Sequence, residues 1–471
     1  MEQNKPFIRL LRSPYHFYFF DVNRNQVVRV SKKTYQNLQE WLETGEQPRM
    51  DRTIVNLQER GYLSDFHVKE IEHPMTPVVT DLLQTQIHSM VLQLTQECNF
   101  RCSYCIYSES HSKLQRVHSD KKMSRETAYR AIDFFAEHTA SVNYPRIAFY
   151  GGEPLLEFEM MKELTAYARK VFGDREIRFT FTTNGSLLTR EVAEFCLDNQ
   201  IGFLISLDGP EKIHNVNRRF AGNGKGSYET VRKNIDMIYK NYPKLWDGVS
   251  ANMVIDQQYD FDEITTLFNE EEFASISQFL LSDMDDIYSV EKTVRTTSFR
   301  AKEEYHKFAA YIDYLKNGDY TGKNWFEKDA VMGLKKITSE MKPQNQLSER
   351  SSHSGPCIPG STKLFVNADG LFFPCERVSE FSDTVCIGDL DHGFDTDKVL
   401  HLLNLGKLNG ENCKQCWAFT HCTLCARHAD DHGKLSGDFK NSFCNRVRYG
   451  MERRLMTYIM MKECQRGEIG S

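Results

Sequence analysis

The sequence lacks the long apolar runs, the export signal and the excess of positive charge that mark several protein classes. No stretch approaches the roughly 18–20 consecutive apolar residues that span a bilayer. The start, Met1–Leu11, mixes acidic and basic residues and has no apolar signal-peptide core. The 59 Lys and Arg against 65 Asp and Glu give a net charge of −6, which provides no general attraction to phosphate backbones or anionic membranes. We therefore expect a cytoplasmic protein that binds neither nucleic acid nor membrane.

Proline is also scarce, with 13 residues in 471, and no internal repeat is found. The hydrophobic content of 40% is ordinary for a soluble globular protein. At roughly 150 residues per domain, the length predicts two to four domains and excludes a single small module.

What the sequence does contain is cysteine, with 13 residues. Disulfides do not persist in a reducing compartment, so metal or cluster ligation is the leading explanation. Cys98, Cys102 and Cys105 stand together, and nine more lie between Cys357 and Cys464. Cys196 falls on the apolar face of a helical pattern, where we expect a core residue. Cys464, near the end of the last helical pattern, is expected to be a spare thiol.

Residues 1–80 predict a small winged-helix-like domain. His16–Asp21 and Val27–Val30 are strand-like runs on either side of a turn. Apolar residues at helical spacing follow Ser31, a suitable N-cap, and a second helical pattern ends at Gly61.

Residues 88–300 alternate short apolar runs with amphipathic helices, a rhythm that favours parallel βαβ units. The six predicted strands are 89–94, 146–150, 178–182, 202–207, 249–254 and 275–281. We therefore predict an α/β fold with a partial (β/α)6 TIM-like barrel. Residues 301–356 would form a helical bridge and a polar linker, and residues 357–471 a Cys-rich domain.

The cysteine motif follows the first predicted barrel strand, in the segment LTQECNFRCSYCIYS. Three thiolates at C-x3-C-x2-C spacing can hold three irons of a cubic cluster and leave the fourth iron open to a substrate. The alternatives are a zinc site short of one ligand and three buried core thiols.

Polar or glycine-rich segments end the next three strands. They are Gly151–Pro154, Asn184–Gly185 and Ser206–Pro210, and His214 and Arg218 follow the last of these. Each alone is typical of a turn. Because parallel strands end at one edge of a sheet, we expect these segments to surround a single site.

These residues resemble the radical S-adenosylmethionine (SAM) superfamily over residues ~88–300. The resemblance implies a [4Fe–4S] cluster on Cys98, Cys102 and Cys105 whose free iron chelates SAM. Its reduction would generate a 5′-deoxyadenosyl radical that removes a hydrogen from a substrate carbon. The implied SAM contacts are Tyr104 near the adenine, Gly151, Gly152 and Glu153 at the ammonium, Asn184 and Ser206 at the ribose, and Arg218 at the carboxylate. Asp208 and His214 match the pattern without an assigned role.

The C-terminal cysteines taken alone also fit a zinc ribbon. In this context they resemble the SPASM extension of radical SAM enzymes, which carries two auxiliary [4Fe–4S] clusters, so that the chain would hold three. The resemblance gives Cys357, Cys375 and Cys425 to the first cluster and Cys413, Cys416, Cys422 and Cys444 to the second. Two residues separate Cys422 from Cys425 where the family has three, which bears on the assignment of Cys425.

Two further residues concern the first auxiliary cluster. Cys386 would be its fourth ligand, or, if it does not bind, an iron would be open to a substrate thiolate. Glu376 directly follows Cys375. In related sulfatase maturases an acidic residue here takes a proton from the substrate, and the alternative is a solvated surface glutamate.

The N-terminal pattern resembles the winged-helix recognition element of enzymes that modify ribosomally made peptides. In such modules the leader of a precursor peptide adds a strand to the hairpin edge. The alternative is a docking or dimerisation domain.

The leading hypothesis is therefore a peptide-maturing radical SAM/SPASM enzyme that forms thioethers between a cysteine sulfur and a carbon. Its partners would be a precursor peptide and a reducing donor such as a flavodoxin or ferredoxin. Rival products are carbon–carbon crosslinks and matured sulfatases. A zinc-ribbon, winged-helix nucleic-acid-binding protein is the competing class, and the net charge of −6 argues against it.

Overall fold

The N-terminal residues form a small sheet covered by two helices. A computed structural model describes residues 5–48, 51–108, 115–284, 287–289, 294–353 and 355–467. The antiparallel sheet has the order β1 (Ile8–Arg12), β2 (Phe17–Asp21), β3 (Gln26–Val30), and it is followed by α1 (Lys32–Thr44) and α2 (Arg52–Glu59). Ser31 caps α1 by accepting a hydrogen bond from the Thr34 amide, as its position in the sequence suggests. The sequence did not predict β1.

The two faces of this sheet bury different partners, because successive side chains of a strand point to opposite sides. Phe19 of β2 packs with Leu38 and Trp41 of α1. Tyr18 and Phe20, its neighbours on β2, belong instead to a cluster with buried residues of two helices far along the chain, α13 (Trp325–Glu340) and α17 (Cys444–Gln465). The N-terminal residues therefore share a core with the C-terminal helix.

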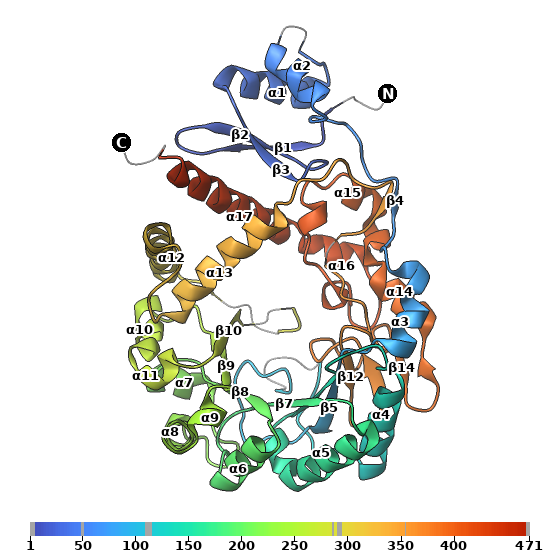
Figure 1. Cartoon of the computed structure of the whole chain (residues 1–471), viewed down its shortest axis with the longest axis vertical. Coiled ribbons are helices and arrows are strands. Elements are labelled where there is room, and N and C mark those ends of the chain that lie inside the picture. The colour runs from blue at the N-terminus through green and yellow to red at the C-terminus, as the bar shows by residue number, and fades with distance from the viewer. Residues whose placement is uncertain are drawn as a thin grey trace.

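The largest element is the predicted parallel sheet. Its strands, in spatial and chain order, are β5 (Ser89–Thr95), β6 (Arg146–Gly151), β7 (Arg178–Thr183), β8 (Gly202–Ser206), β9 (Ser250–Ile255) and β10 (Gln278–Asp283). The main connecting helices, which line its outer side in Figure 1, are α4 (Arg125–Glu137), α5 (Phe158–Phe172), α6 (Arg190–Asp198) and α8 (Tyr228–Asn241). The α/β fold with a partial barrel is thus confirmed.

The Cys-rich region extends this sheet, which the sequence did not predict. Strand β12 (Leu364–Val366) pairs parallel with β5. Beyond it, β13 (Leu371–Phe373), β14 (Gly388–Asp389) and β15 (Gly393–Phe394) continue antiparallel to a total of ten strands. Cys375 and Cys386 therefore flank strands that are continuous with the barrel.

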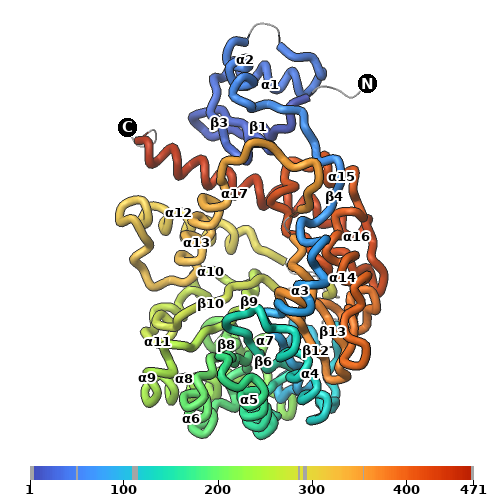
Figure 2. Tube along the Cα trace, turned by 45° about the vertical axis from the view of Figure 1, so that its right-hand side comes forward, coloured from blue at the N-terminus to red at the C-terminus, as the bar shows by residue number. Residues whose placement is uncertain are grey.

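Two long helices follow the barrel, as expected for residues 301–340: α12 (Thr297–Asn317) and α13. In Figures 1 and 2 they stand opposite the Cys-rich region, and the N-terminal sheet lies across α17. The expected linker includes β11 (Arg350–Ser351), which pairs with β4 (Glu70–Ile71). The shorter helices are α3 (Val79–Thr85), α7 (Glu211–Asn217), α9 (Pro243–Trp246), α10 (Phe261–Thr265), α11 (Glu271–Ala274), α14 (Thr396–Leu403), α15 (Gly410–Lys414) and α16 (Gly437–Ser442). Among the described residues, none of the helices is long and apolar enough to cross a membrane.

Candidate functional site

Cys98, Cys102 and Cys105 lie in one loop after β5. The Phe100 amide donates to the Cys98 sulfur at 3.4 Å, and the Cys105 amide donates to the Cys102 carbonyl at 3.1 Å. Burial raises the pKa of all three thiols, that of Cys102 to about 12, and the charges of Cys102 and Cys105 also raise the pKa of Cys98. Buried neighbouring thiols ionise when a cation binds them, so their environment fits a metal-containing group.

The loop is fixed to the segment that follows α7. The Arg101 amide donates to the Arg219 carbonyl at 2.8 Å, and the Ala221 amide donates to the Asn99 carbonyl at 2.8 Å. The cysteines and Arg218 are therefore held in one structural unit.

Gly151 and Gly152 bring the end of β6 against the cysteine loop. At Gly151, whose φ is +149°, a Cβ would lie 2.2 Å from the Thr95 carbonyl oxygen. At Gly152 it would lie 2.2 Å from the Glu97 carbonyl oxygen. The glycines thus admit the chain's own backbone, which is a structural requirement in addition to the ligand contact expected from the sequence.

Glu153 is fully buried and joins the segment after β6 to the end of β7. Its carboxylate accepts hydrogen bonds from the Leu155 amide at 3.1 Å, the Thr183 hydroxyl at 2.8 Å and the Asn184 amide at 2.7 Å. Burial raises the pKa of Glu153 to about 7, and these hydrogen bonds oppose the shift. Asn184 in turn donates to the Asn99 side chain at 2.7 Å, which connects this carboxylate to the cysteine loop.

Tyr104, Asp208 and Arg218 form a second polar group beside the cysteines. Arg218 donates to the Tyr104 hydroxyl at 2.6 Å and lies 3.8 Å from the Asp208 carboxylate, which also bonds the Tyr104 hydroxyl. Burial raises the pKa of Asp208, and the Arg218 charge opposes this. The buried Nε of Arg218 has no hydrogen-bond partner among the described residues. A free guanidinium donor fits a carboxylate ligand.

The sequence assigned no role to Asp208 and His214, and the structure gives both a supporting one. The Asp208 amide donates to His214 Nδ1 at 3.5 Å, so His214 Nε2 donates to the Ser227 hydroxyl at 3.0 Å. Ser227 donates to the Arg218 carbonyl at 3.0 Å. Burial is the main cause that holds the His214 pKa well below its usual value. Ser206, also buried, ends β8 opposite Asn252 of β9.

Charge interactions link several of the C-terminal cysteines to one another. Burial mainly raises the pKa of Cys375, and the charges of Cys357 and Cys425 add to this. In the same way, the charges of Cys413 and Cys416 raise the pKa values of Cys422 and Cys444, for which burial is again the main cause. Cys386 donates to the Gly388 carbonyl at 3.6 Å. Within the described parts of the chain, no three His, Cys, Asp or Glu residues are grouped to hold a single metal ion.

The Glu376 side chain is only 21% exposed and is paired with Lys363, whose Nζ lies 3.0 Å from both carboxylate oxygens. Burial tends to raise the Glu376 pKa, but the Lys363 charge and hydrogen bonds bring it below its usual value. Glu376 is thus an ionised carboxylate held by a lysine, and not a freely solvated surface glutamate.

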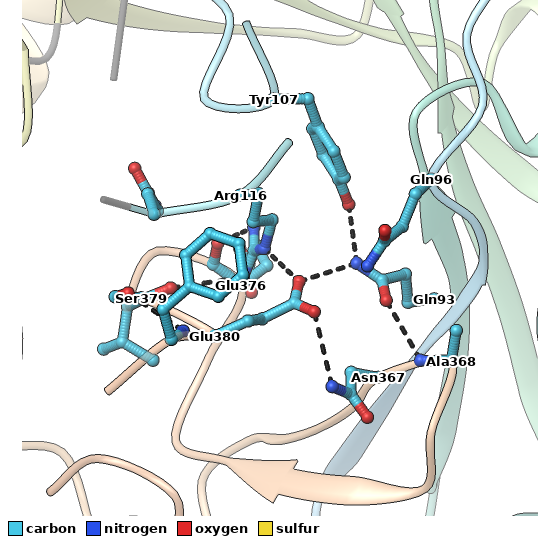
Figure 3. A network of polar contacts seen from close by, with 12 residues as sticks. Gln93, Gln96, Tyr107, Arg116, Asn367, Ala368, Glu376, Ser379 and Glu380 are labelled. Carbon is cyan, nitrogen blue, oxygen red and sulfur yellow. Dashed lines mark hydrogen bonds and ion pairs between the residues drawn. The ribbon is translucent and has the colours of Figure 1, made fainter. Parts of the chain in front are cut away.

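A buried network that the sequence did not reveal joins the loop after Cys105 to the segment after Cys375 (Figure 3). Arg116 bonds the Glu380 carboxylate and the Glu376 carbonyl oxygen. Glu380 also accepts from Gln93 of β5 at 2.6 Å and from Asn367 at 3.3 Å. The two cysteine-bearing segments therefore have fixed positions relative to each other.

Comparisons with known proteins agree with this arrangement. Residues 92–269 match the family model described as Radical SAM superfamily. The radical SAM cyclopropyl synthase TigE of Paramaledivibacter caminithermalis is 21% identical over 72% of this chain and 68% of its own length. A cysteine-type anaerobic sulfatase-maturating enzyme of Clostridium perfringens is 26% identical over 74% of this chain and 90% of its own length.

A solved structure supports the same fold. It is native anSMEcpe with bound AdoMet and the Kp18Cys peptide, with 22% identity, 79% of this chain and 98% of that chain covered, and a TM-score of 0.55. The family implies SAM and a [4Fe–4S] cluster as cofactors, and the fold of the Cys-rich C-terminal region is consistent with a SPASM-like domain. Residues 92–269 thus form a radical SAM domain, and together with the sulfatase-maturating relatives this domain identifies the protein as an enzyme.

Proposed function

We propose that this enzyme forms thioether crosslinks between a cysteine sulfur and a carbon of another residue in a ribosomally made precursor peptide. The C. perfringens relative is named for maturing sulfatases, and anSMEcpe was solved with a peptide bound. Both support a polypeptide substrate for this chain.

The residues around the cysteine loop would hold SAM and a cluster. Cys98, Cys102 and Cys105 would hold the cluster, and the unpaired Nε of Arg218 would bind the SAM carboxylate. Tyr104, Gly151, Gly152, Glu153, Asn184 and Ser206 would make the remaining contacts to SAM. Bound together, the two groups supply a radical that removes a hydrogen atom from a substrate carbon.

The proposal of a thioether rests on the cysteines that would hold the first auxiliary cluster. Cys357, Cys375 and Cys425 influence one another, whereas Cys386 is engaged with the Gly388 carbonyl. Three protein ligands would leave one iron of an auxiliary cluster free to bind a substrate thiolate. Glu376, which is ionised beside Lys363, would accept the thiol proton.

The second auxiliary cluster would be held by Cys413, Cys416, Cys422 and Cys444. A flavodoxin or ferredoxin would supply electrons, and the N-terminal sheet would bind the leader of the precursor. Sulfatase maturation is the second candidate function, supported by the 90% coverage of the C. perfringens relative.

The product distinguishes these activities. In thioether formation one hydrogen leaves carbon and one leaves the thiol, so each bridge lowers the peptide mass by one hydrogen pair. Alkylation should fail at the bridged cysteine, and changing that cysteine to Ser should prevent the mass loss. A peptide that loses the same mass but keeps every cysteine free to alkylate would identify a carbon–carbon crosslink and reject the thioether.

The metal content tests the cofactors separately. Anaerobically reconstituted protein should hold about twelve irons, from three cubic clusters. Replacing Cys98, Cys102 and Cys105 with Ala should remove about four irons and abolish SAM cleavage. Stoichiometric zinc with little iron would contradict the proposal.

A further inference from the structure

Lys440 is a buried cation with an unusual partner. Among the described residues, three lysine and arginine side chains are buried, namely Arg116, Arg218 and Lys440. Arg116 is paired with Glu380 and Arg218 with Asp208. Lys440, only 1% exposed, has no carboxylate within ion-pair distance in the described chain.

The Lys440 ammonium instead contacts one of the second set of cysteines. Its Nζ lies 3.5 Å from the Cys413 sulfur and 3.3 Å from the Asn409 side-chain oxygen. Its charge also lowers the pKa values of Cys422 and Cys444, against the larger effect of burial. Lys440 therefore contacts one cysteine of this set and acts electrostatically on two others.

The surrounding chain is built to keep Lys440 in this place. It belongs to α16, which Ser436 caps by accepting from the Phe439 amide. The Asn409 amide group donates to the Gly437 carbonyl at 2.8 Å, and a Cβ at Gly437 would lie 2.7 Å from the Leu408 carbonyl oxygen. The glycine thus allows α16 to approach the segment that carries Asn409.

A buried ammonium group is costly unless an anion compensates it. The amide oxygen of Asn409 is neutral, so the compensating charge must come from the cysteine side. A cubic cluster bound by four thiolates carries a net negative charge, which one-electron reduction increases. A fixed cation beside it stabilises the reduced form more than the oxidised form.

We propose that Lys440 is the counter-ion of the cluster held by Cys413, Cys416, Cys422 and Cys444, and that its charge raises the reduction potential of that cluster. The inference rests on the proposed second auxiliary cluster and is independent of the bond made in the peptide. In this assignment Lys440 acts on the cluster through its positive charge and does not contact the substrate.

The test uses the full chain with Cys98, Cys102 and Cys105 changed to Ala, so that only auxiliary clusters remain. Lys440→Met removes the charge at similar size, and Lys440→Arg keeps it. Lys414→Met is the matched control, because Lys414 follows Cys413 directly but is partly exposed and paired with Glu411 at 2.8 Å. Iron content and the midpoint potential of each cluster, followed by electron paramagnetic resonance, are measured for all variants.

In Lys440→Met, one of the two midpoint potentials should shift to more negative values. In Lys440→Arg and Lys414→Met, both midpoint potentials should stay close to those of the parent protein. Loss of one cluster in Lys440→Met alone, with Lys440→Arg retaining it, would equally support the counter-ion. Full iron with unchanged potentials in Lys440→Met would overturn the inference, as would equal cluster loss in Lys440→Met and Lys440→Arg. A parent protein without iron at these cysteines would instead reject the proposed cluster itself.

Discussion

Gly152 illustrates how a missing side chain positions the cysteine loop. Its amide donates to the Thr95 carbonyl at 2.9 Å, and its Cα faces the Glu97 carbonyl so closely that no Cβ fits. A Cβ there would also lie 3.0 Å from the Cβ of Cys98. The obstacle is backbone, which cannot rotate away as a flexible side chain can.

We therefore predict that Gly152→Ala displaces the loop, destabilises the protein by about 1–3 kcal/mol and lowers the iron content by about four per chain. Thermal unfolding and iron analysis of anaerobic protein check this. Gly222→Ala is the control, because a Cβ at Gly222 meets nothing within 4 Å. Normal iron content in Gly152→Ala would show that the loop tolerates the displacement.

The sequence predicted some of these residues and not others, for a physical reason. Cysteine spacing and the order of Glu153, Asn184 and Arg218 along successive strands are local signals, readable without coordinates. The roles of Asp208 and Lys440 depend on partners brought near by folding, Tyr104 in one case and Cys413 in the other. The spacing of residue types along the chain does not reveal which distant residues come into contact.

Strands, too, differ in whether a local sequence pattern or a distant partner determines them. The six barrel strands were predicted because short apolar runs alternate with amphipathic helices, and the shifts are small, such as β10 beginning at Gln278 where residue 275 was expected. That shift arises because α11 ends at Ala274 and Ser275 caps it. Strands β12 to β15 have two or three residues each, too few to show a period, and they exist because β12 pairs with β5.

The buried pair Arg116–Glu380 links two of these elements. It lies between the loop that leaves Cys105 and the segment that leaves Cys375, with additional bonds to β5 and to the end of β12. Removing one partner leaves the other charge buried and uncompensated.

Arg116→Met should therefore destabilise the protein by about 3–5 kcal/mol, and the double change with Glu380→Leu should be less destabilising than Arg116→Met alone. Denaturant unfolding measures both. Arg130→Met is the control, because Arg130 makes an exposed ion pair with Asp391 of the Cys-rich region, and little change is expected. A double variant as unstable as the sum of the single ones would mean that the two side chains act independently.

In the molecule as a whole, the N-terminal sheet is not a detachable module. Its inner face shares a core with α13 and α17, and Asn25, in the β2–β3 turn, donates to the Glu340 carbonyl at 2.8 Å. The same side chain contacts His421, the neighbour of Cys422, at 2.9 Å. Deleting residues 1–80 would therefore expose the core of α17 and disturb the segment around Cys422. A loss of peptide modification in the truncated protein would then have two explanations, a lost leader-binding site and a disturbed C-terminal region.

A substitution on β3 separates leader binding from this structural role. The hairpin formed by β2 and β3 has one edge covered by β1, so β3 is the edge at which a leader strand would add. The backbone amides of neighbouring residues in a strand point to opposite sides. One of the amides of Val28 and Arg29 therefore faces β2, and the other faces away from it. Proline removes the amide donor at either position.

Val28→Pro and Arg29→Pro should consequently differ. The variant that loses a bond to β2 should unfold at a lower temperature, whereas the other should keep a near-normal unfolding temperature and iron content but bind the precursor more weakly. Val28→Ala and Arg29→Ala account for the lost side chains. Precursor binding by fluorescence anisotropy, together with SAM cleavage without precursor, distinguishes recognition from catalysis. Unchanged precursor affinity in the stable proline variant would mean that the leader does not extend this sheet.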